Sequence, residues 1–208
     1  MLRNRFFLVG LFLIVLAIIY YSFFDAGNTD TPSVTNPESY RLEVLQKRKD
    51  KEEFFRTSSE SPFTDKTKFK SLTYFNPDPA YRVTARLEPF ADKKKLVVPL
   101  TDGSEEIYEK YAHAVFTIND ELCRLLVLKH DNTLSVLFKD QTSGKETYGG
   151  GRYLDFSPDD VKENRLGIDF NEAYNPYCAY NYEYACPLPP AENSLPVAVR
   201  AGEKYVEP

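Results

Sequence analysis

The sequence predicts a mainly β fold (β-rich α+β): an antiparallel, partly closed barrel or compact sandwich of six to eight strands, preceded by one transmembrane helix and one charged helix. The aromatic residues are 15 Tyr and 15 Phe with no Trp, and 14 prolines interrupt the chain, which is typical of strands and ordered loops. Short runs in which apolar and polar residues alternate follow Pro62. A chain of 208 residues accommodates one such domain with its own core.

The N-terminal segment has the composition of a membrane anchor. Phe6 to Phe24 is a run of nineteen residues without a charge, about 28 Å long as a helix. Arg3 and Arg5 precede the run, so the positive-inside rule places the N-terminus in the cytoplasm and the rest of the chain on the periplasmic or extracellular side. A cleaved signal peptide is the alternative, but the run is longer than the usual apolar region and is followed by no small-x-small cleavage site.

A linker and a charged helix are expected next. Residues 25–39 are rich in Gly, Asn, Thr, Ser and Pro, which predicts a flexible linker before a single domain at 40–208. Asn36 and Pro37 resemble an N-cap followed by proline at the first helical position, which predicts a helix to about Arg56. Its apolar residues are sparse in the middle, which favours a solvated stalk docked at its ends over a partner-binding helix.

The β-rich part is read from alternation and turn signals. Tyr81 to Leu87 alternates with period two, as expected for a strand with one buried face. Three further runs are separated only by three-residue polar segments, which predicts an antiparallel meander. A helical turn is expected at Ser157-Pro158. In order, the predicted strands after the first are 96–100, the meander strands 112–118, 122–129 and 133–138, then 152–156, 166–170 and a last strand at 195–200.

Charge and composition exclude some classes of function. The net charge is −5 and the pI is about 5.2, and no sustained basic stripe is present, so nucleic acid is not an expected partner. Only two histidines occur and no cluster of cysteines accompanies them, so neither a zinc site nor any cofactor is predicted.

Several long blocks resemble a bacterial family known only as domain of unknown function 1684. The resemblance covers roughly residues 53–208, and because that family has no assigned activity, it implies a domain boundary and no chemistry. The blocks that carry it are Phe69–Phe75, Tyr81–Val83, Phe138–Leu154, Asp169–Tyr180, Cys186–Pro196 and Arg200–Lys204.

Two polar features within these blocks have alternative interpretations. The triple glycine 149–151 is expected to form a tight turn or bulge rather than a phosphate-binding loop, because no Lys-Ser/Thr pair follows it. Arg152 is expected to pair with Asp169 or with a ligand carboxylate. Asp169 and Asn171 occupy the strand face opposite Leu166, Ile168 and Phe170, so we expect both side chains to face solvent or a cleft.

The cysteines are interpreted from their spacing. Cys178 and Cys186 are eight residues apart in a domain expected outside the cytoplasm, which predicts a disulfide. Closing this loop would stabilise the fold by about 2.6 kcal/mol in the chain-entropy model. Cys123 lies in an apolar strand and is expected to be buried like a small hydrophobic residue.

These features together predict a membrane-anchored envelope protein that acts as a non-catalytic binding or structural module. Its dense tyrosines, from Tyr174 to Tyr184, either cover one end of the barrel or form a platform for a sugar, peptide or other small-molecule or protein partner. The alternative is a carboxylate-dependent hydrolase that uses Asp169 and Glu203, with Asn171 or Asn175 orienting the substrate. The candidate binding residues are Arg152, Tyr153, Asp169, Asn171, Tyr174, Asn175, Tyr177, Asn193, Arg200 and Glu203.

Overall fold

The computed structural model describes residues 11, 12, 14–16, 36–92 and 94–206. The chain divides into two units, Met1–Asp30 and Thr31–Pro208, and the second contains every element discussed below. Among the described residues, none of the helices combines the length and the apolar composition that crossing a membrane requires. The predicted span at residues 6–24 lies outside the described residues except at 11, 12 and 14–16, as does most of the predicted linker.

One long helix, α2 (Pro37–Thr57), opens the second unit, as the N-cap signal predicts. The Asn36 side chain accepts hydrogen bonds from the backbone N–H groups of Glu38 and Ser39, and Pro37 occupies a position that needs no N–H donor. The expectation of a stalk docked only at its ends is wrong. Tyr40, Val44 and Phe55 are buried, and residues in the middle of the helix contact the rest of the domain.

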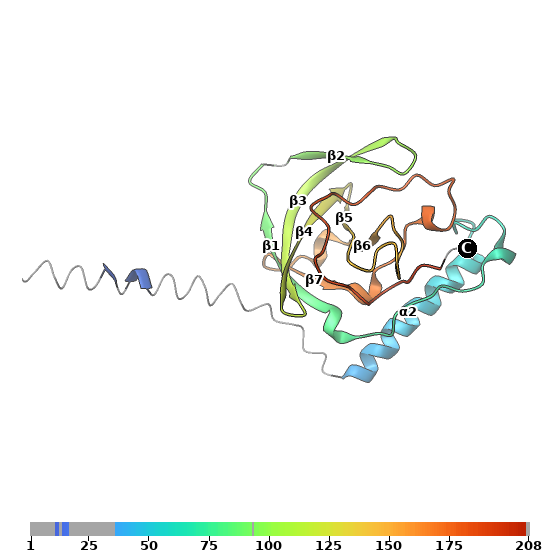
Figure 1. The fold of residues 1–208 in the computed structure, drawn as a ribbon, viewed down its shortest axis with the longest axis horizontal. Helices are drawn as coiled ribbons and strands as arrows, with labels where there is room; N and C mark the ends of the chain where they lie inside the picture. The colour runs from blue at the N-terminus through green and yellow to red at the C-terminus, as the bar shows by residue number, and fades with distance from the viewer. Residues whose placement is uncertain (1–10, 13, 17–35, 93, 207–208) are drawn as a thin grey trace, which may run out of the picture. The chain divides into compact units, whose positions relative to one another are not determined.

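Seven antiparallel strands form a half-barrel (Figure 1). The order in the sheet is β6-β5-β4-β3-β1-β7, and β2 pairs with β3 beside that path. The meander β3-β4-β5 has the order that its short polar turns predict. The strands are β1 (Arg82–Pro89), β2 (Lys95–Pro99), β3 (Glu105–Ile118), β4 (Glu121–His130), β5 (Thr133–Phe138), β6 (Arg152–Phe156) and β7 (Arg165–Asp169).

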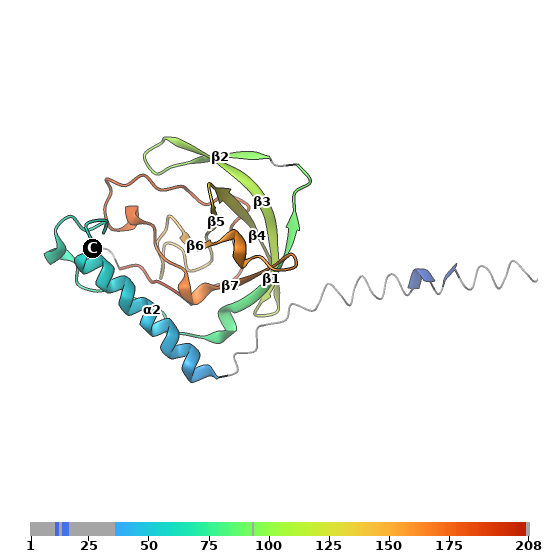
Figure 2. The same ribbon diagram turned by 180° about the vertical axis from the view of Figure 1, so that it is seen from behind.

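The core fills the concave side of the half-barrel. Val83, Ala85 and Leu87 of β1 are buried while their neighbours are not, which confirms the alternation read from the sequence. The C-terminal segment crosses this side (Figures 1 and 2) and adds Leu195 and Val199 to the same hydrophobic cluster. The half-barrel is therefore closed by irregular chain rather than by further strands.

Two of the predicted strands differ from the structure by more than one or two residues at their ends. β3 begins at Glu105, seven residues before the predicted start, because its first half pairs with β2 as a largely exposed arm that lacks a continuous apolar face. The predicted last strand at 195–200 is wrong, since the chain there is irregular. Pro196 has no N–H to donate, and the hydrogen bonds of this segment go to the loop at Lys139 and Gln141.

Short 3-10 helices connect the remaining elements. The turn predicted at Ser157-Pro158 is present and has a capping box between Ser157 and Asp160. The last two of these helices, η4 and η5, lie in the segment 170–179, which contributes residues to the candidate site. Their bounds are η1 (Lys66–Lys68), η2 (Pro79–Tyr81), η3 (Pro158–Asp160), η4 (Phe170–Glu172) and η5 (Tyr177–Ala179).

Candidate functional site

Helix α2 borders three cavities in succession. Tyr40, Glu43 and Lys47 line the first, Lys47, Arg48 and Lys51 line the second, and Lys51 with Phe54 and Phe55 lines the third. These positions recur every three or four residues and so belong to one face of the helix. Tyr174 lines all three cavities. The charged helix therefore forms one wall of three neighbouring cavities, which share Tyr174 as a lining residue.

The aromatic cavity lies at the C-terminal end of α2 and has a volume of about 520 Å³. Lys51 and Cys186 are among its other lining residues, and the Lys51 ammonium lies 4.6 Å from the centre of the Tyr174 ring. The Tyr153 hydroxyl donates to the carbonyl of Pro187, and the Tyr174 hydroxyl donates to Asp155. Six aromatic side chains define this cavity: Phe54, Phe55, Tyr153, Tyr174, Tyr177 and Tyr184.

The polar cleft lies at the N-terminal end of α2, with a volume of about 480 Å³. The Tyr40 hydroxyl donates to the Asp169 carboxylate at 2.8 Å, and burial, followed by the Asp169 charge, raises the pKa of Tyr40. Asp155 accepts from Ser135 Oγ at 2.6 Å. Each of these two carboxylates thus has donors from the chain itself. The residues that define the cleft are Tyr40, Lys47, Arg82, Asp155, Asp169 and Glu172.

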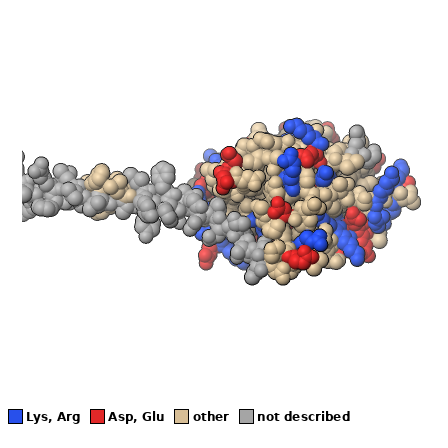
Figure 3. All heavy atoms as spheres, turned by 60° about the horizontal axis from the view of Figure 1, so that its bottom comes forward, with Lys and Arg blue, Asp and Glu red and all other residues tan. Residues whose placement is uncertain are grey.

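The central cavity, of about 180 Å³, lies between the other two along α2. Lys47 Nζ is 2.5 Å from Glu172 Oε1, and Lys51 Nζ is 2.5 Å from Glu203 Oε1. On the face shown in Figure 3, acidic and basic side chains are interspersed. The central cavity, in contrast, is lined by three basic and two acidic side chains. The residues that define this cavity are Lys47, Arg48, Lys51, Tyr74, Glu172 and Glu203.

Arg152 is a buried residue that connects β6 to the loop at Asp140 and to the C-terminal segment. Its side chain is 1% exposed, and its Nη2 is 2.6 Å from the fully buried Asp140. The guanidinium also donates to the carbonyls of Val199 and Ala201. The expected pairing with Asp169 is therefore wrong, because the triple-glycine turn places Arg152 against the loop that carries Asp140. In that turn Gly151 has φ +100°, and a Cβ there would lie 2.7 Å from the carbonyl oxygen of Phe138.

Three other candidate binding residues also line none of the three cavities. Asn175 is buried and donates to the Tyr180 hydroxyl and the carbonyl of Lys204. Asn193 is fully buried and bridges two strands, since its side chain binds the backbone N–H and carbonyl of Leu126 and the carbonyl of Leu137. Arg200 is exposed and pairs with Glu146. Asn193 therefore completes the backbone hydrogen bonding where β4 and β5 diverge, and Arg200 makes a surface ion pair.

The acids of the hydrolase alternative line different cavities, Asp169 the polar cleft and Glu203 the central cavity. Glu203 is 1% exposed and accepts hydrogen bonds from the Asn175 N–H and the Tyr180 hydroxyl, both at 2.7 Å. Asn171, expected to face solvent or a cleft, is buried where it lines the central cavity, and it donates to Tyr40, Asp78 and Asp169. This arrangement gives the hydrolase interpretation no support.

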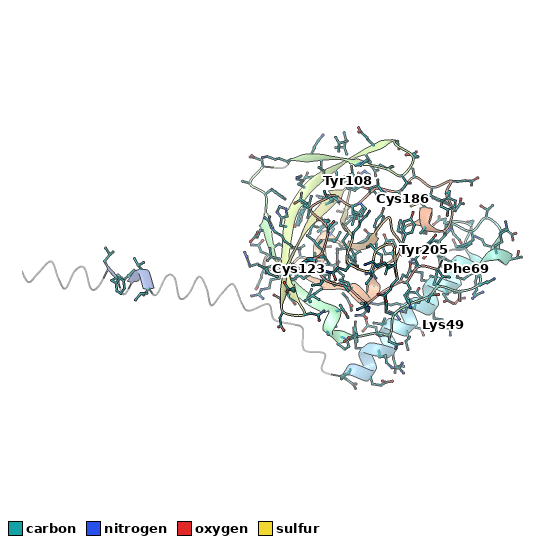
Figure 4. The ribbon with its side chains drawn as sticks, viewed as in Figure 1. Lys49, Phe69, Tyr108, Cys123, Cys186 and Tyr205 are labelled. Atoms are coloured by element: carbon teal, nitrogen blue, oxygen red, sulfur yellow. The ribbon has the colours of Figure 1, made fainter. Side chains whose placement is uncertain are left out.

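The thiols of Cys178 and Cys186 are free, so the predicted disulfide is wrong. The backbone N–H of Cys178 donates to Cys186 Sγ at 3.2 Å, and the Cys186 thiol is the main cause that lowers the pKa of Cys178 to about 7. Sequence spacing brings the two residues together but does not set the geometry that a covalent bond needs. Cys123 is buried in β4, as expected, and lies apart from Cys186 in Figure 4.

The sequence did not identify α2 as part of the site. The signal was present, because Tyr40, Glu43, Lys47, Lys51 and Phe54 follow helical spacing. The face is mostly charged, however, and resembles a solvated surface. Among the described residues, no group of three or more His, Cys, Asp or Glu side chains is placed to hold a metal ion.

The chain is similar to one family of proteins and to a solved structure. A family model described as "Protein of unknown function (DUF1684)" matches residues 67–204. Among solved structures, the chain is similar to an uncharacterized protein of Haloarcula marismortui whose solution structure was determined by NMR. The two share 35% sequence identity with a TM-score of 0.63, over 80% of this chain and 95% of that chain. No curated protein matches.

Proposed function

The chain belongs to the DUF1684 family of proteins of unknown function, and we propose that it is a non-catalytic binding module, tethered to a membrane by residues 6–24, that holds an apolar or aromatic group of its ligand in the aromatic cavity. The observation that carries this proposal is a cavity of about 520 Å³ walled by six aromatic side chains. Such a volume suits a small-molecule group.

The tyrosines of the cavity favour an apolar group over a sugar. The hydroxyls of Tyr153 and Tyr174 are engaged by Pro187 and Asp155, so these residues present their rings to the cavity. The nearby rings of Tyr177 and Tyr184 pack edge to face, with centroids 5.3 Å apart. A sugar needs several polar partners at such a surface, whereas a planar or aliphatic group gains from ring contacts alone.

The engaged carboxylates favour binding over catalysis. Asp169 accepts from Tyr40 and Asn171, and Glu203 accepts from Lys51, Asn175 and Tyr180. A general base needs a lone pair directed at the substrate. These two acids instead stabilise the arrangement of the residues that surround the three cavities.

The membrane tether rests on composition. Phe6 to Phe24 carries no charge, and Arg3 and Arg5 lie on its N-terminal side, so residues 40–208 belong on the periplasmic or extracellular side.

Protease added to intact cells, or to cells with the outer membrane opened, is expected to degrade residues 40–208. The physical reason is the orientation set by the two arginines. The measurement is an immunoblot for the domain before and after treatment, with a cytoplasmic protein as the control for lysis. Protection of the domain until the inner membrane is broken would refute the outward placement.

Replacing Tyr184 with alanine is expected to weaken binding of naphthylacetamide, a neutral aromatic probe, about tenfold, because one wall of the cavity is lost. Isothermal titration calorimetry on the full-length protein in lipid nanodiscs, with empty nanodiscs as the blank, measures the dissociation constant.

Tyr182→Ala is the matched control for Tyr184→Ala. Tyr182 belongs to the same segment but is 80% exposed, against 38% for Tyr184, and does not line the aromatic cavity. Its removal is expected to leave the affinity within twofold. Equal losses from the two variants, or no binding of the probe to the unmodified protein, would show that the aromatic cavity is not the binding site.

A further inference from the structure

We infer that the central cavity binds an anionic group of the ligand, of the size of a carboxylate or phosphate, while the apolar part of the same ligand occupies the aromatic cavity. This inference rests on the proposed function and specifies the ligand class as an amphipathic anion. Its basis is a buried cation without a carboxylate partner, Arg48, and two buried donors without a hydrogen-bond acceptor, Arg48 Nε and the Tyr74 hydroxyl.

The cations of the central cavity differ in their partners. Lys47 is paired with both Glu43 and Glu172, and Lys51 is paired with Glu203. Arg48, the third cation, donates instead to the backbone carbonyls of Phe75, at 2.8 Å, and Asn171, at 3.3 Å. Among the described residues, Arg48 therefore has no carboxylate in hydrogen-bonding contact, and burial lowers the pKa of its guanidinium. An anion in the cavity would give this buried guanidinium a charged partner.

Two buried donors lie at this cavity without an acceptor in hydrogen-bonding geometry among the described residues, Arg48 Nε and the Tyr74 hydroxyl. The Glu203 carboxylate is close enough to the hydroxyl to act on its pKa, but it already accepts from Lys51, Asn175 and Tyr180. The two side chains stack, with Arg48 Cζ 4.4 Å from the centre of the Tyr74 ring. Burial, and then the nearby Glu203 charge, raises the pKa of Tyr74, so its hydroxyl keeps its proton. Buried donors without acceptors are rare and costly, and an oxyanion offers acceptors to both.

Position connects this cavity to the aromatic one. Lys51 and Tyr174 line both, and the Lys51 ammonium lies between them, 5.5 Å from the centre of the Phe55 ring. A volume of about 180 Å³ is equivalent to roughly six waters, enough for a carboxylate or phosphate. One ligand can therefore extend from the aromatic rings to Arg48.

The experiment compares two probes that share a ring system and differ in charge, naphthylacetate and naphthylacetamide. Both are titrated calorimetrically into the full-length protein in nanodiscs. The unmodified protein is expected to bind the anion at least about tenfold more tightly than the neutral amide. Equal affinities would overturn the anionic subsite and leave the aromatic cavity in place as the binding site. If neither probe binds, the proposed function and this inference are both wrong.

Arg48→Gln is expected to bring the ratio of the two affinities close to one. Lys49→Gln is the matched control, because Lys49 is the next residue of α2, carries the same charge and is exposed on the side away from the cavities (Figure 4). It is expected to keep the tenfold ratio. If both variants lower the ratio equally, the preference is a general charge effect and the inference is overturned.

Tyr74→Phe provides a second variant in case Arg48→Gln fails to fold. It removes only the hydroxyl, and because that hydroxyl has no acceptor in hydrogen-bonding geometry without ligand, the melting temperature is expected not to fall. The preference for the anion is expected to drop about three- to fivefold. A lower melting temperature with an unchanged preference would assign Tyr74 to the fold alone and contradict the inference.

Discussion

Replacing Arg152 with methionine is expected to lower the free energy of unfolding by about 3–5 kcal/mol. The Arg152 and Asp140 side chains are 1% and 0% exposed, and their atoms are 2.6 Å apart. Removing the guanidinium leaves the Asp140 charge buried without its counterion. It also removes the donor that serves the carbonyls of Val199 and Ala201, so the C-terminal segment loses its attachment to β6.

Urea unfolding monitored by circular dichroism measures this loss, and Arg200→Met is the matched control. Arg200 also pairs with a carboxylate, Glu146, but at the surface, where its side chain is 58% exposed. Water solvates both partners once the pair is broken, so only a small fraction of the Arg152 effect is expected. Similar losses from the two variants would show that burial is not the reason the Arg152 pair matters.

Replacing Phe55 with alanine is expected to cost about 3–5 kcal/mol, since it leaves a cavity where α2 packs on the rest of the domain. Phe55 is 1% exposed and lies at the centre of an aromatic cluster. Its ring centroid is 5.6 to 6.1 Å from five others, those of Phe54, Phe63, Phe69, Tyr177 and Tyr180.

Phe54→Ala separates stability from binding. Phe54 is the preceding residue of α2, but it is only partly buried and lines the aromatic cavity. Its loss is expected to weaken naphthylacetamide binding several-fold with a clearly smaller change in the urea midpoint than Phe55→Ala causes. If Phe54→Ala destabilises the fold as much as Phe55→Ala and leaves binding unchanged, its assignment to the cavity is wrong.

Prediction from sequence worked best for elements whose signal is local. The bounds of β6, Arg152–Phe156, were predicted correctly, and so was the start of α2 after the Asn36 cap. The signal failed where pairing depends on a distant partner. Leu195 to Arg200 is apolar enough for a strand. Pro196, however, has no backbone N–H to donate, and the segment forms hydrogen bonds with loop residues Lys139 and Gln141 rather than with a neighbouring strand.

The candidate site was predicted only in part. Tyr153, Tyr174 and Tyr177 do line the aromatic cavity, because a dense tyrosine segment near Cys186 offered a visible signal. Arg152 and Arg200, expected on one surface with Asp169 and Glu203, are a buried ion-pair partner and an exposed one. The sequence cannot distinguish these roles, because the burial of an arginine and the identity of its partner depend on the tertiary structure.

By itself, the sequence determined the β-rich class, the single charged helix, the meander and the family, because alternation, capping residues and short polar turns act between residues that are close in the chain. Only the tertiary structure decided that Lys51 neutralises Glu203 across 152 residues, that Arg48 has no carboxylate partner among the described residues, and that the thiols of Cys178 and Cys186 are free. Those outcomes depend on which buried charges and donors the packing of the whole domain brings together, and no local pattern encodes that arrangement.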